Sequence, residues 1–331
     1  MYAIEAKNLY KNYFSEKSGK FAGLGNSKTQ YNTNLNSPSG DLGVGVSFEV
    51  NEGEIFGIIG PDGAGKTTLF RILTTLILAD KGTATVNGFD VVNDYREIRK
   101  CVGYMPGRFS LYQDLTVEEN LKFFATVFNT TVEENYELIK DIYQQIEPFK
   151  KRRAGKLSGG MKQKLALSCA LIHKPTVLFL DEPTTGVDPV SRKEFWGMLK
   201  KLKAQGITIL VSTPYMDEAS LCDRIALIQQ GRFLNIDTPQ NIVNQYKNKL
   251  LAVRSKNMSK LLKDLRSNKL YENSFAFGDA HHLSVNSLEF AISSLEEYLL
   301  KCGHIDIQIT EIQPTIEDCF MEISRDVARR V

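Results

Sequence analysis

A run of eight residues near the start of the chain has the composition of a phosphate-binding loop. It reads G-x-x-x-x-G-K-T and consists of Gly60, Pro61, Asp62, Gly63, Ala64, Gly65, Lys66 and Thr67. The flanking apolar patterns at 55–59 and 68–73 predict a strand before it and a helix after it. Glycines lack a Cβ, so several backbone N–H groups can turn toward one anion, and the helix start adds the positive end of its dipole. We therefore expect Lys66 to reach the β- and γ-phosphates of a nucleotide and Thr67 to complete a magnesium shell. A glycine-rich turn that merely carries a lysine is the alternative.

Two carboxylates, Asp181 and Glu182, end an apolar run at 176–180. Such a run is typical of a buried strand. Acids at the carboxyl end of a strand beside a phosphate loop are placed to hold magnesium and to activate water. We interpret this pair as part of the same site, and solvated acids that cap a strand are the alternative.

A second glycine-containing turn lies between these two motifs. Residues 157–163 read L-S-G-G-M-K-Q and lead into a helix of small residues at 165–171. Bare N–H groups and a serine hydroxyl at a helix start suit a phosphate, although such turns also simply begin helices. Residues 157–160 are called the Ser-Gly-Gly turn below.

Composition excludes several classes of protein. The 331 residues include 41 Lys and Arg against 39 Asp and Glu, a net charge of +2, so the balance favours neither nucleic acid nor an anionic membrane surface as partner. Five cysteines without a C-x-x-C pair argue against a disulfide framework or a zinc site, and we expect reduced thiols in a cytosolic protein. The N-terminus lacks a signal pattern, and no run approaches the roughly 20 apolar residues that span a bilayer. Any membrane role must therefore come through a partner.

The remaining periodicity predicts an α/β core with a helical insertion. A polar stretch at 15–41 predicts an exposed, mobile loop. Thr116 and Glu119 form a capping-box pattern that predicts the start of the helical insertion. The other core elements expected are strands at 2–10, 46–50 and 83–86, a helix at 95–100, two helices within 132–149 and a hairpin at 225–235.

The last quarter of the chain predicts a separate small unit. The elements expected there are a strand at 250–253, a helix at 258–265, strands at 274–277 and 283–285, a helix at 288–300 and a strand at 305–310. This βαββαβ order fits a ferredoxin-like or similar α+β domain. The adjacent His281 and His282 have no Cys or acid cluster beside them, so we interpret them as a solvated turn and not as a metal site.

Taken in order, the three motifs resemble those of the ATP-binding subunit of an ABC transporter. The third continues past the acids as L-F-L-D-E-P-T-T-G-V-D-P at 178–189. The resemblance implies a P-loop NTPase, ABC-type ATPase domain over residues 1–245 with a helical subdomain at about 107–170, and an accessory domain at 246–331. The tail at 312–320 resembles that of daunorubicin-resistance and related multidrug or polysaccharide export subunits. The resemblance therefore implies an ATP-hydrolysing subunit of an exporter.

The resemblance also implies roles for individual residues. Asp181 and Thr67 would hold Mg²⁺, and Glu182 would be the general base that polarises the attacking water. The residues implied to bind ATP are Tyr13, which would stack on adenine, and Gly60, Pro61, Asp62, Gly63, Ala64, Gly65, Lys66, Thr67 and Thr68. The residues implied to complete the ATP site of a second chain are Leu157, Ser158, Gly159, Gly160 and Gln163, with Asp188 in the loop between the two sites.

Two positions depart from the family pattern. Gly107 stands where the family usually has a glutamine that helps to place metal and water, and Pro214 stands where it usually has a histidine that contacts the γ-phosphate. We expect an impaired ATP site in this chain beside an intact Ser-Gly-Gly turn, which suits a heterodimer with a second ATP-binding chain. The alternatives are a homodimer and compensation by Gln113 or another donor.

The implied partners are that second chain and integral membrane permease subunits, with no nucleic acid. They imply a location on the cytoplasmic, inner face of the cell membrane. The aromatic segment 108–112 is a candidate docking surface for a permease helix, although burial in the insertion's own core is the alternative. Two other functions stay open: a regulatory nucleotide-binding module with little ATPase activity, and a soluble ABC ATPase outside transport.

Overall fold

The computed structural model describes residues 1–13, 45–268, 270–271, 273–285 and 288–330. Contacts divide them into two compact units, Met1–Pro239 and Gln240–Arg330. The boundary expected from sequence, between 245 and 246, lies inside the second unit. The predicted mobile loop at 15–41 lies outside the described residues.

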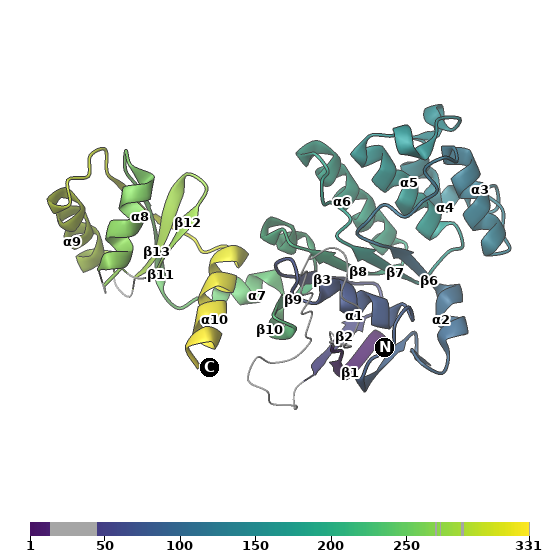
Figure 1. The fold of residues 1–331 in the computed structure, drawn as a ribbon, viewed down its shortest axis with the longest axis horizontal. Helices are drawn as coiled ribbons and strands as arrows, with labels where there is room; N and C mark the ends of the chain where they lie inside the picture. Colours follow the sequence, from purple (N-terminus) through teal and green to yellow (C-terminus); the bar gives the residue numbers. More distant parts are fainter. Residues whose placement is uncertain (14–44, 269, 272, 286–287, 331) are drawn as a thin grey trace, which may run out of the picture. The chain divides into compact units, whose positions relative to one another are not determined.

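A six-stranded sheet forms the centre of the first unit (Figure 1). Its strands are β3 (Ile55–Ile59), β6 (Val102–Met105), β7 (Val177–Asp181), β8 (Thr208–Thr213), β9 (Arg224–Gln229) and β10 (Arg232–Asp237). The order is β10-β9-β3-β8-β7-β6, and all pairs from β9 to β6 are parallel. Both β3 and β7 are buried along their length, which explains their continuous apolar sequence. The predicted hairpin is confirmed as β9 and β10, with Gln230 and Gly231 in the left-handed conformation that its tight turn requires.

A smaller antiparallel sheet completes the core of this unit. Its order is β2-β1-β4-β5, and its strands are β1 (Tyr2–Tyr10), β2 (Val46–Asn51), β4 (Lys81–Val86) and β5 (Phe89–Asp90). The three strands predicted in this region are thereby confirmed. The Phe48 ring of β2 lies 5.7 Å from that of Phe56 in β3, so one apolar core joins the two sheets.

Helices cover the central sheet and build the insertion. They are α1 (Lys66–Leu73), α2 (Tyr95–Cys101), α3 (Val117–Val127), α4 (Tyr136–Tyr143), α5 (Gly159–Leu171) and α6 (Pro189–Ala204), with 3₁₀ turns η1 (Glu147–Phe149), η2 (Ala154–Lys156) and η3 (Met216–Leu221). In Figure 1 the helices α3, α4 and α5 gather beside the β6 edge of the sheet. The Phe70 ring of α1 packs edge-on against Phe179 of β7 at 6.0 Å. This contact fixes the helix that begins with Lys66 against the strand that ends in Asp181.

The helical insertion departs from the sequence-based expectation in one place. The capping box at its start is confirmed, because Thr116 Oγ1 accepts the Glu119 N–H at 3.2 Å and the Glu119 carboxylate accepts the Thr116 N–H at 2.7 Å. Of the two helices predicted within 132–149, the first is α4. The second is only the single turn η1, whose Pro148 has no N–H with which to extend a helix.

The second unit has the predicted βαββαβ order. It comprises β11 (Lys249–Arg254), α8 (Met258–Ser267), β12 (Ser274–Phe277), β13 (Ala280–Val285), α9 (Leu288–Lys301) and β14 (Gln308–Ile312), between α7 (Pro239–Asn244) and α10 (Ile316–Arg330). The sheet order is β12-β13-β11-β14, and every neighbouring pair is antiparallel. The last strand begins at Gln308 and not at Ile305, because Asp306 has a left-handed backbone (φ +56°) that interrupts extended structure.

The interpretation of His281 and His282 as a solvated turn is wrong. Both lie on β13, where His281 Nε2 is 2.7 Å from the Met258 carbonyl and His282 Nδ1 is 2.7 Å from Asp318 Oδ1 of α10. The pair therefore joins the sheet to α8 on one side and to α10 on the other. Among the described residues, no group of three or more His, Cys, Asp or Glu side chains is arranged to hold a metal ion.

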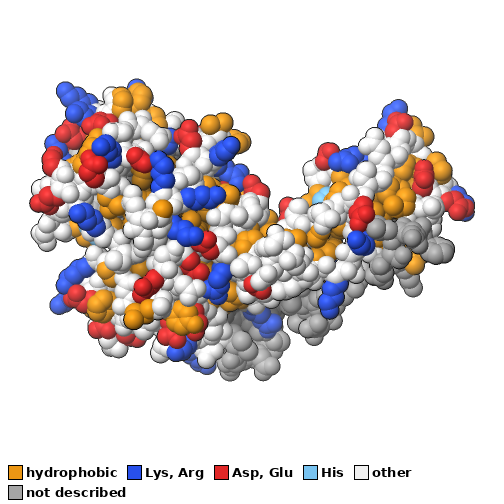
Figure 2. Space-filling model, turned by 180° about the vertical axis from the view of Figure 1, so that it is seen from behind, with side chains coloured by type: hydrophobic (Ala, Val, Ile, Leu, Met, Phe, Trp, Pro, Cys, Tyr) orange, Lys and Arg blue, Asp and Glu red, His pale blue; other side chains and the backbone are white. Residues whose placement is uncertain are grey.

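Charges of both signs are interspersed over the face of the molecule seen in Figure 2, in keeping with the net charge of +2. None of the helices formed by the described residues has the length and apolar composition needed to cross a membrane.

Candidate functional site

The phosphate loop connects β3 to α1 as the sequence predicts. Gly63 and Gly65 have φ of +77° and +101°, which side chains with a Cβ rarely adopt. The loop wraps around Lys66, whose side chain is only 3% exposed. Its ammonium donates to the Gly60 carbonyl at 2.8 Å and to the Pro61 carbonyl at 3.0 Å. The loop therefore holds a buried cation at the start of a helix, where an anion is favoured.

One of the two acids contacts this cation, and the other precedes that acid in the chain at the carboxyl end of β7. Glu182 Oε1 lies 3.2 Å from Lys66 Nζ. Asp181 is buried, and its Oδ1 accepts a hydrogen bond from Ser212 Oγ at 2.7 Å. Glu182 has a left-handed backbone (φ +51°) and donates its N–H to the Ser212 carbonyl at 3.1 Å. Non-glycine residues in this conformation often mark functional sites.

Ser212 was not singled out by the sequence, although it fixes both acids. The parallel register pairs Asp181 of β7 with Ser212 of β8, which places the hydroxyl beside the carboxylate. A serine next to the end of an apolar strand is the only signal that the sequence offered, and it becomes informative only once the strand order is known.

The Ser-Gly-Gly turn packs against a different segment, residues 186–191, which includes the start of α6. Ser158 is the N-cap of α5, and its hydroxyl accepts the Met161 N–H at 3.4 Å. A Cβ added to Gly160 would lie 2.8 Å from Ser191 Oγ and 3.1 Å from Ser191 Cβ, so the turn packs closely against this residue. The turn therefore contacts the first turn of α6.

Asp188 begins α6. Its Oδ1 accepts the Ser191 N–H at 3.0 Å, and this hydrogen bond holds the pKa of the Asp188 carboxyl below its usual value. The structure thus brings the predicted residues together as two groups: the phosphate loop with the acids, and the Ser-Gly-Gly turn with Asp188. Thr68 is buried in α1, and Leu157 is buried beside the turn, whereas Tyr13 is exposed at the end of the described N-terminal segment.

The two departures from the family pattern lie close to the first group. A Cβ added to Gly107 would be 3.1 Å from the Asp181 carbonyl oxygen and 3.7 Å from Glu182 Cβ. Pro214 directly follows β8, whose last residue, Thr213, accepts the Tyr215 N–H at 3.1 Å. Gln113 contacts Gly155, and none of its described contacts is with either acid.

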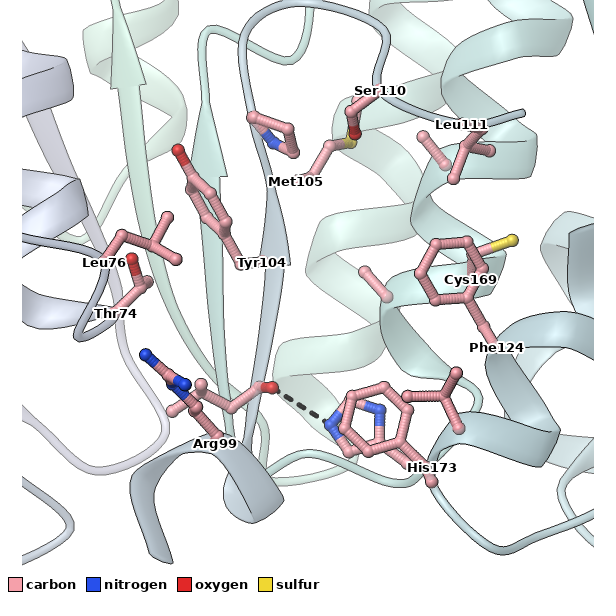
Figure 3. A pocket seen from close by; sticks show the side chains of 16 residues that line it. Thr74, Leu76, Arg99, Tyr104, Met105, Ser110, Leu111, Phe124, Cys169 and His173 are labelled. Carbon is pink, nitrogen blue, oxygen red and sulfur yellow. Dashed lines mark hydrogen bonds between the residues drawn. The ribbon is translucent and has the colours of Figure 1, made fainter. Parts of the chain in front are cut away.

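An apolar cavity of about 460 Å³ lies between the sheet edge and the helical insertion (Figure 3). In Figure 3, Phe124 and His173 stand on one side of it, and Leu76 and Arg99 on the other. The His173 ring stacks on Phe128 at 3.7 Å, and its Nε2 is 3.0 Å from the Val102 carbonyl. Burial lowers the pKa of His173, so the ring is neutral at neutral pH and the cavity wall there carries no charge.

The sequence and the fold of this chain match those of known proteins. A family model described as ABC transporter matches residues 44–185. A probable multidrug ABC transporter ATP-binding protein, YbhF of Escherichia coli (strain K12), is 39% identical over 278 residues, which are 83% of this chain and 47% of that protein. The chain therefore spans about half the length of this curated relative.

Two further relatives match a shorter region. The Nod factor export ATP-binding protein I of Rhizobium sp. (strain N33) is 40% identical over 205 residues, 61% of this chain and 67% of the relative. The daunorubicin resistance ATP-binding protein DrrA2 of Streptomyces coeruleorubidus is 42% identical over 204 residues, 60% of this chain and 63% of the relative.

A solved structure of an ATP-binding subunit of an ABC transporter has the same fold. It superposes with a TM-score of 0.60 at 26% identity and covers 74% of this chain and 93% of its own.

Replacing Lys66 tests the phosphate loop. We expect Lys66→Ala to lower the affinity of the full chain for a fluorescent ATP analogue by about 10- to 150-fold, because hydrogen bonds to a charged group are worth about 1.5–3 kcal/mol. Lys100→Ala is the control, since it removes an exposed lysine paired with Glu97. An affinity that Lys66→Ala leaves within twofold of the unchanged chain would contradict the assignment.

Proposed function

The chain belongs to the ABC transporter family of ATP-binding subunits, as its motifs predict, and from that premise we propose that it binds and hydrolyses ATP as one subunit of an exporter. The proposal rests on the contacts that the buried Lys66 ammonium makes with the Glu182 carboxylate and with the loop carbonyls. A cation, a glycine-rich loop at a helix start and a carboxylate at one sheet edge fit a nucleoside triphosphate and its hydrolysis. Two of the relatives are named for Nod factor export and for daunorubicin resistance, which supports transport out of the cell.

The donor set near the acids also fits magnesium. Asp181 and the Thr67 hydroxyl supply oxygen ligands, and Mg²⁺ binds through one or two such groups together with water and phosphate oxygens. When bound, the ion would neutralise charge on the phosphates. Lys66 would leave Glu182 and turn to the β- and γ-phosphates. Glu182, released from that ion pair, would accept a proton from the attacking water.

The Ser-Gly-Gly turn is proposed to act on the ATP of a second chain. Its residues are intact, and Gln163 and Asp188 belong to the same group. The site of this chain, by contrast, carries Gly107 directly beside the acids, with no amide there to place metal or water. We therefore favour a heterodimer in which this chain completes a partner's active site while its own site turns over slowly. A regulatory module with little ATPase activity is the second candidate, because Gly107 and Pro214 favour it as well.

The cavity of Figure 3 is the proposed docking site for a permease helix. Its apolar lining and the neutral His173 suit the apolar face of an amphipathic helix. Leu76 and Val127 line it and are 54% and 55% exposed, so both remain available for contact. This docking would place the chain on the cytoplasmic face of the cell membrane.

The second unit is proposed to be a ferredoxin-like domain that stabilises or regulates the dimer. The order β12-β13-β11-β14 supports this assignment, because each βαβ segment then encloses one antiparallel strand. The family resemblance of the tail at 312–320 supports the accessory role.

Replacing Glu182 separates a slow ATPase from a regulatory module. The measurement is phosphate release by the purified complex whose partner chain carries the matching acid-to-amide change, so that only this chain's site can turn over. We expect Glu182→Gln to lower the remaining rate by about 100-fold, the scale of general base catalysis. Glu194→Gln, which alters an exposed acid paired with Lys164, is the control. The regulatory module would be favoured if the complex with unchanged Glu182 and the altered partner chain released phosphate only at the background rate.

A charge placed in the cavity tests permease docking. We expect Val127→Asp to reduce co-purification of the permease at least tenfold while ATP affinity stays unchanged, because a carboxylate would be desolvated against an apolar helix face. Val92→Asp is a matched control, since Val92 is 51% exposed and does not line the cavity. Equal recovery of the permease with both variants would contradict this docking site.

A further inference from the structure

A buried carboxylate, Glu218, follows the segment that carries Pro214. Glu218 is 1% exposed, and its two oxygens have different partners. Oε2 accepts hydrogen bonds from Thr213 Oγ1 at 2.6 Å and from Thr184 Oγ1 at 3.1 Å. Oε1 accepts from Arg192 Nε at 3.1 Å and lies 3.0 Å from Arg192 Nη2. Glu218 therefore joins the end of β8, the loop after the acids and helix α6.

Arg192 is held on the same segment by two more contacts. Its Cζ lies 4.2 Å from the centre of the Tyr215 ring. Its Nη2 donates to Asp217 Oδ2 at 3.2 Å. Removing one partner of a buried pair leaves the other charge uncompensated, so such a pair resists separation. Residues 213–218 and the first turn of α6 should therefore move together.

The beginning of α6 also packs against the Ser-Gly-Gly turn. The Arg192 N–H donates to the Asp188 carbonyl at 2.9 Å, and Ser191 occupies the space that a Cβ on Gly160 would need. A continuous set of contacts thus runs from Thr213, beside the ATP site of this chain, to the turn that serves the other site.

We propose that Arg192 and Glu218 are positioning residues that hold the Ser-Gly-Gly turn in register with this chain's own ATP site. The role of the turn on a second ATP rests on the proposed function, whereas the mechanical link is a property of this chain alone. The link runs through Thr213, Glu218 and Arg192 and so connects the segment after β8 to the first turn of α6 without using Pro214.

Hydrogen exchange of the full chain tests the link directly. We expect Arg192→Gln to speed amide exchange at least fivefold in peptides spanning 157–165 and 184–192, while peptides spanning 60–73 keep their rates. Lys203→Met is the matched control on the same helix, because it removes the 2.6 Å ion pair with Asp223 and leaves the first turn of α6 intact. Faster exchange confined to 213–221 would overturn the proposal.

A second variant covers the case in which Arg192→Gln fails to fold. Glu218→Gln preserves the side-chain volume and can still accept hydrogen bonds from Thr213 or Arg192, so we expect a smaller increase in exchange, about two- to fivefold, in the same peptides. Rates at 157–165 equal to those of the unchanged chain in this variant would also overturn the proposal.

Turnover of the assembled complex supplies the functional readout. We expect Arg192→Gln to lower kcat about tenfold at an unchanged KM for ATP, and Arg192→Lys to recover part of that loss. A general loss of stability would instead change the KM for ATP and speed amide exchange in all segments. That result would count against a positioning role. A complex in which the unchanged chain supports no turnover at all would refute the proposed function, while the exchange result would still decide the link.

Discussion

The contact between Lys66 and Glu182 is the constraint on which the rest of the site depends. The Lys66 side chain is only 3% exposed, and a charge that is buried in this way must be paired or hydrogen-bonded. Two carbonyls of the phosphate loop and the Glu182 carboxylate meet that need. The start of α1 and the end of β7 are therefore held at one place. Under the proposed function, an entering nucleotide would offer phosphate oxygens in place of the carboxylate, and binding would then be coupled to the release of Glu182.

The sheet order places the end of one strand, β8, beside both parts of the first group of site residues. β8 lies between β3 and β7, so its end adjoins both the phosphate loop and the acids. The segment after β8 carries Pro214 and then Glu218, which binds Arg192 at the start of α6. Under the proposed function, proline at position 214 would impair chemistry in this chain's site, whereas Glu218 and Arg192, which link this segment to α6, are present. Chemical impairment and structural support would then be separable, because different residues of one segment would be responsible for them.

Much of the site could be predicted because its signals are local in sequence. The phosphate loop, the paired acids and the capping box at Thr116 each need only residues of fixed type at fixed spacing. The partners of these groups could not be predicted, because they depend on register and distance in the fold. Ser212 reaches Asp181 only because β7 and β8 pair as they do, and Arg192 meets Glu218 from 26 positions away. His282 looked solvated for the same reason, since its partner Asp318 lies 36 positions further on.

The most direct test of the central claim is to purify the tagged chain from mildly solubilised membranes and to identify every ATP-binding chain that accompanies it. Under the proposed function, this chain completes a partner's active site while its own site is impaired. We therefore predict a second, different chain that carries glutamine and histidine at the positions matching Gly107 and Pro214. Recovery of this chain only with itself would contradict the account, because both sites of the dimer would then lack those groups.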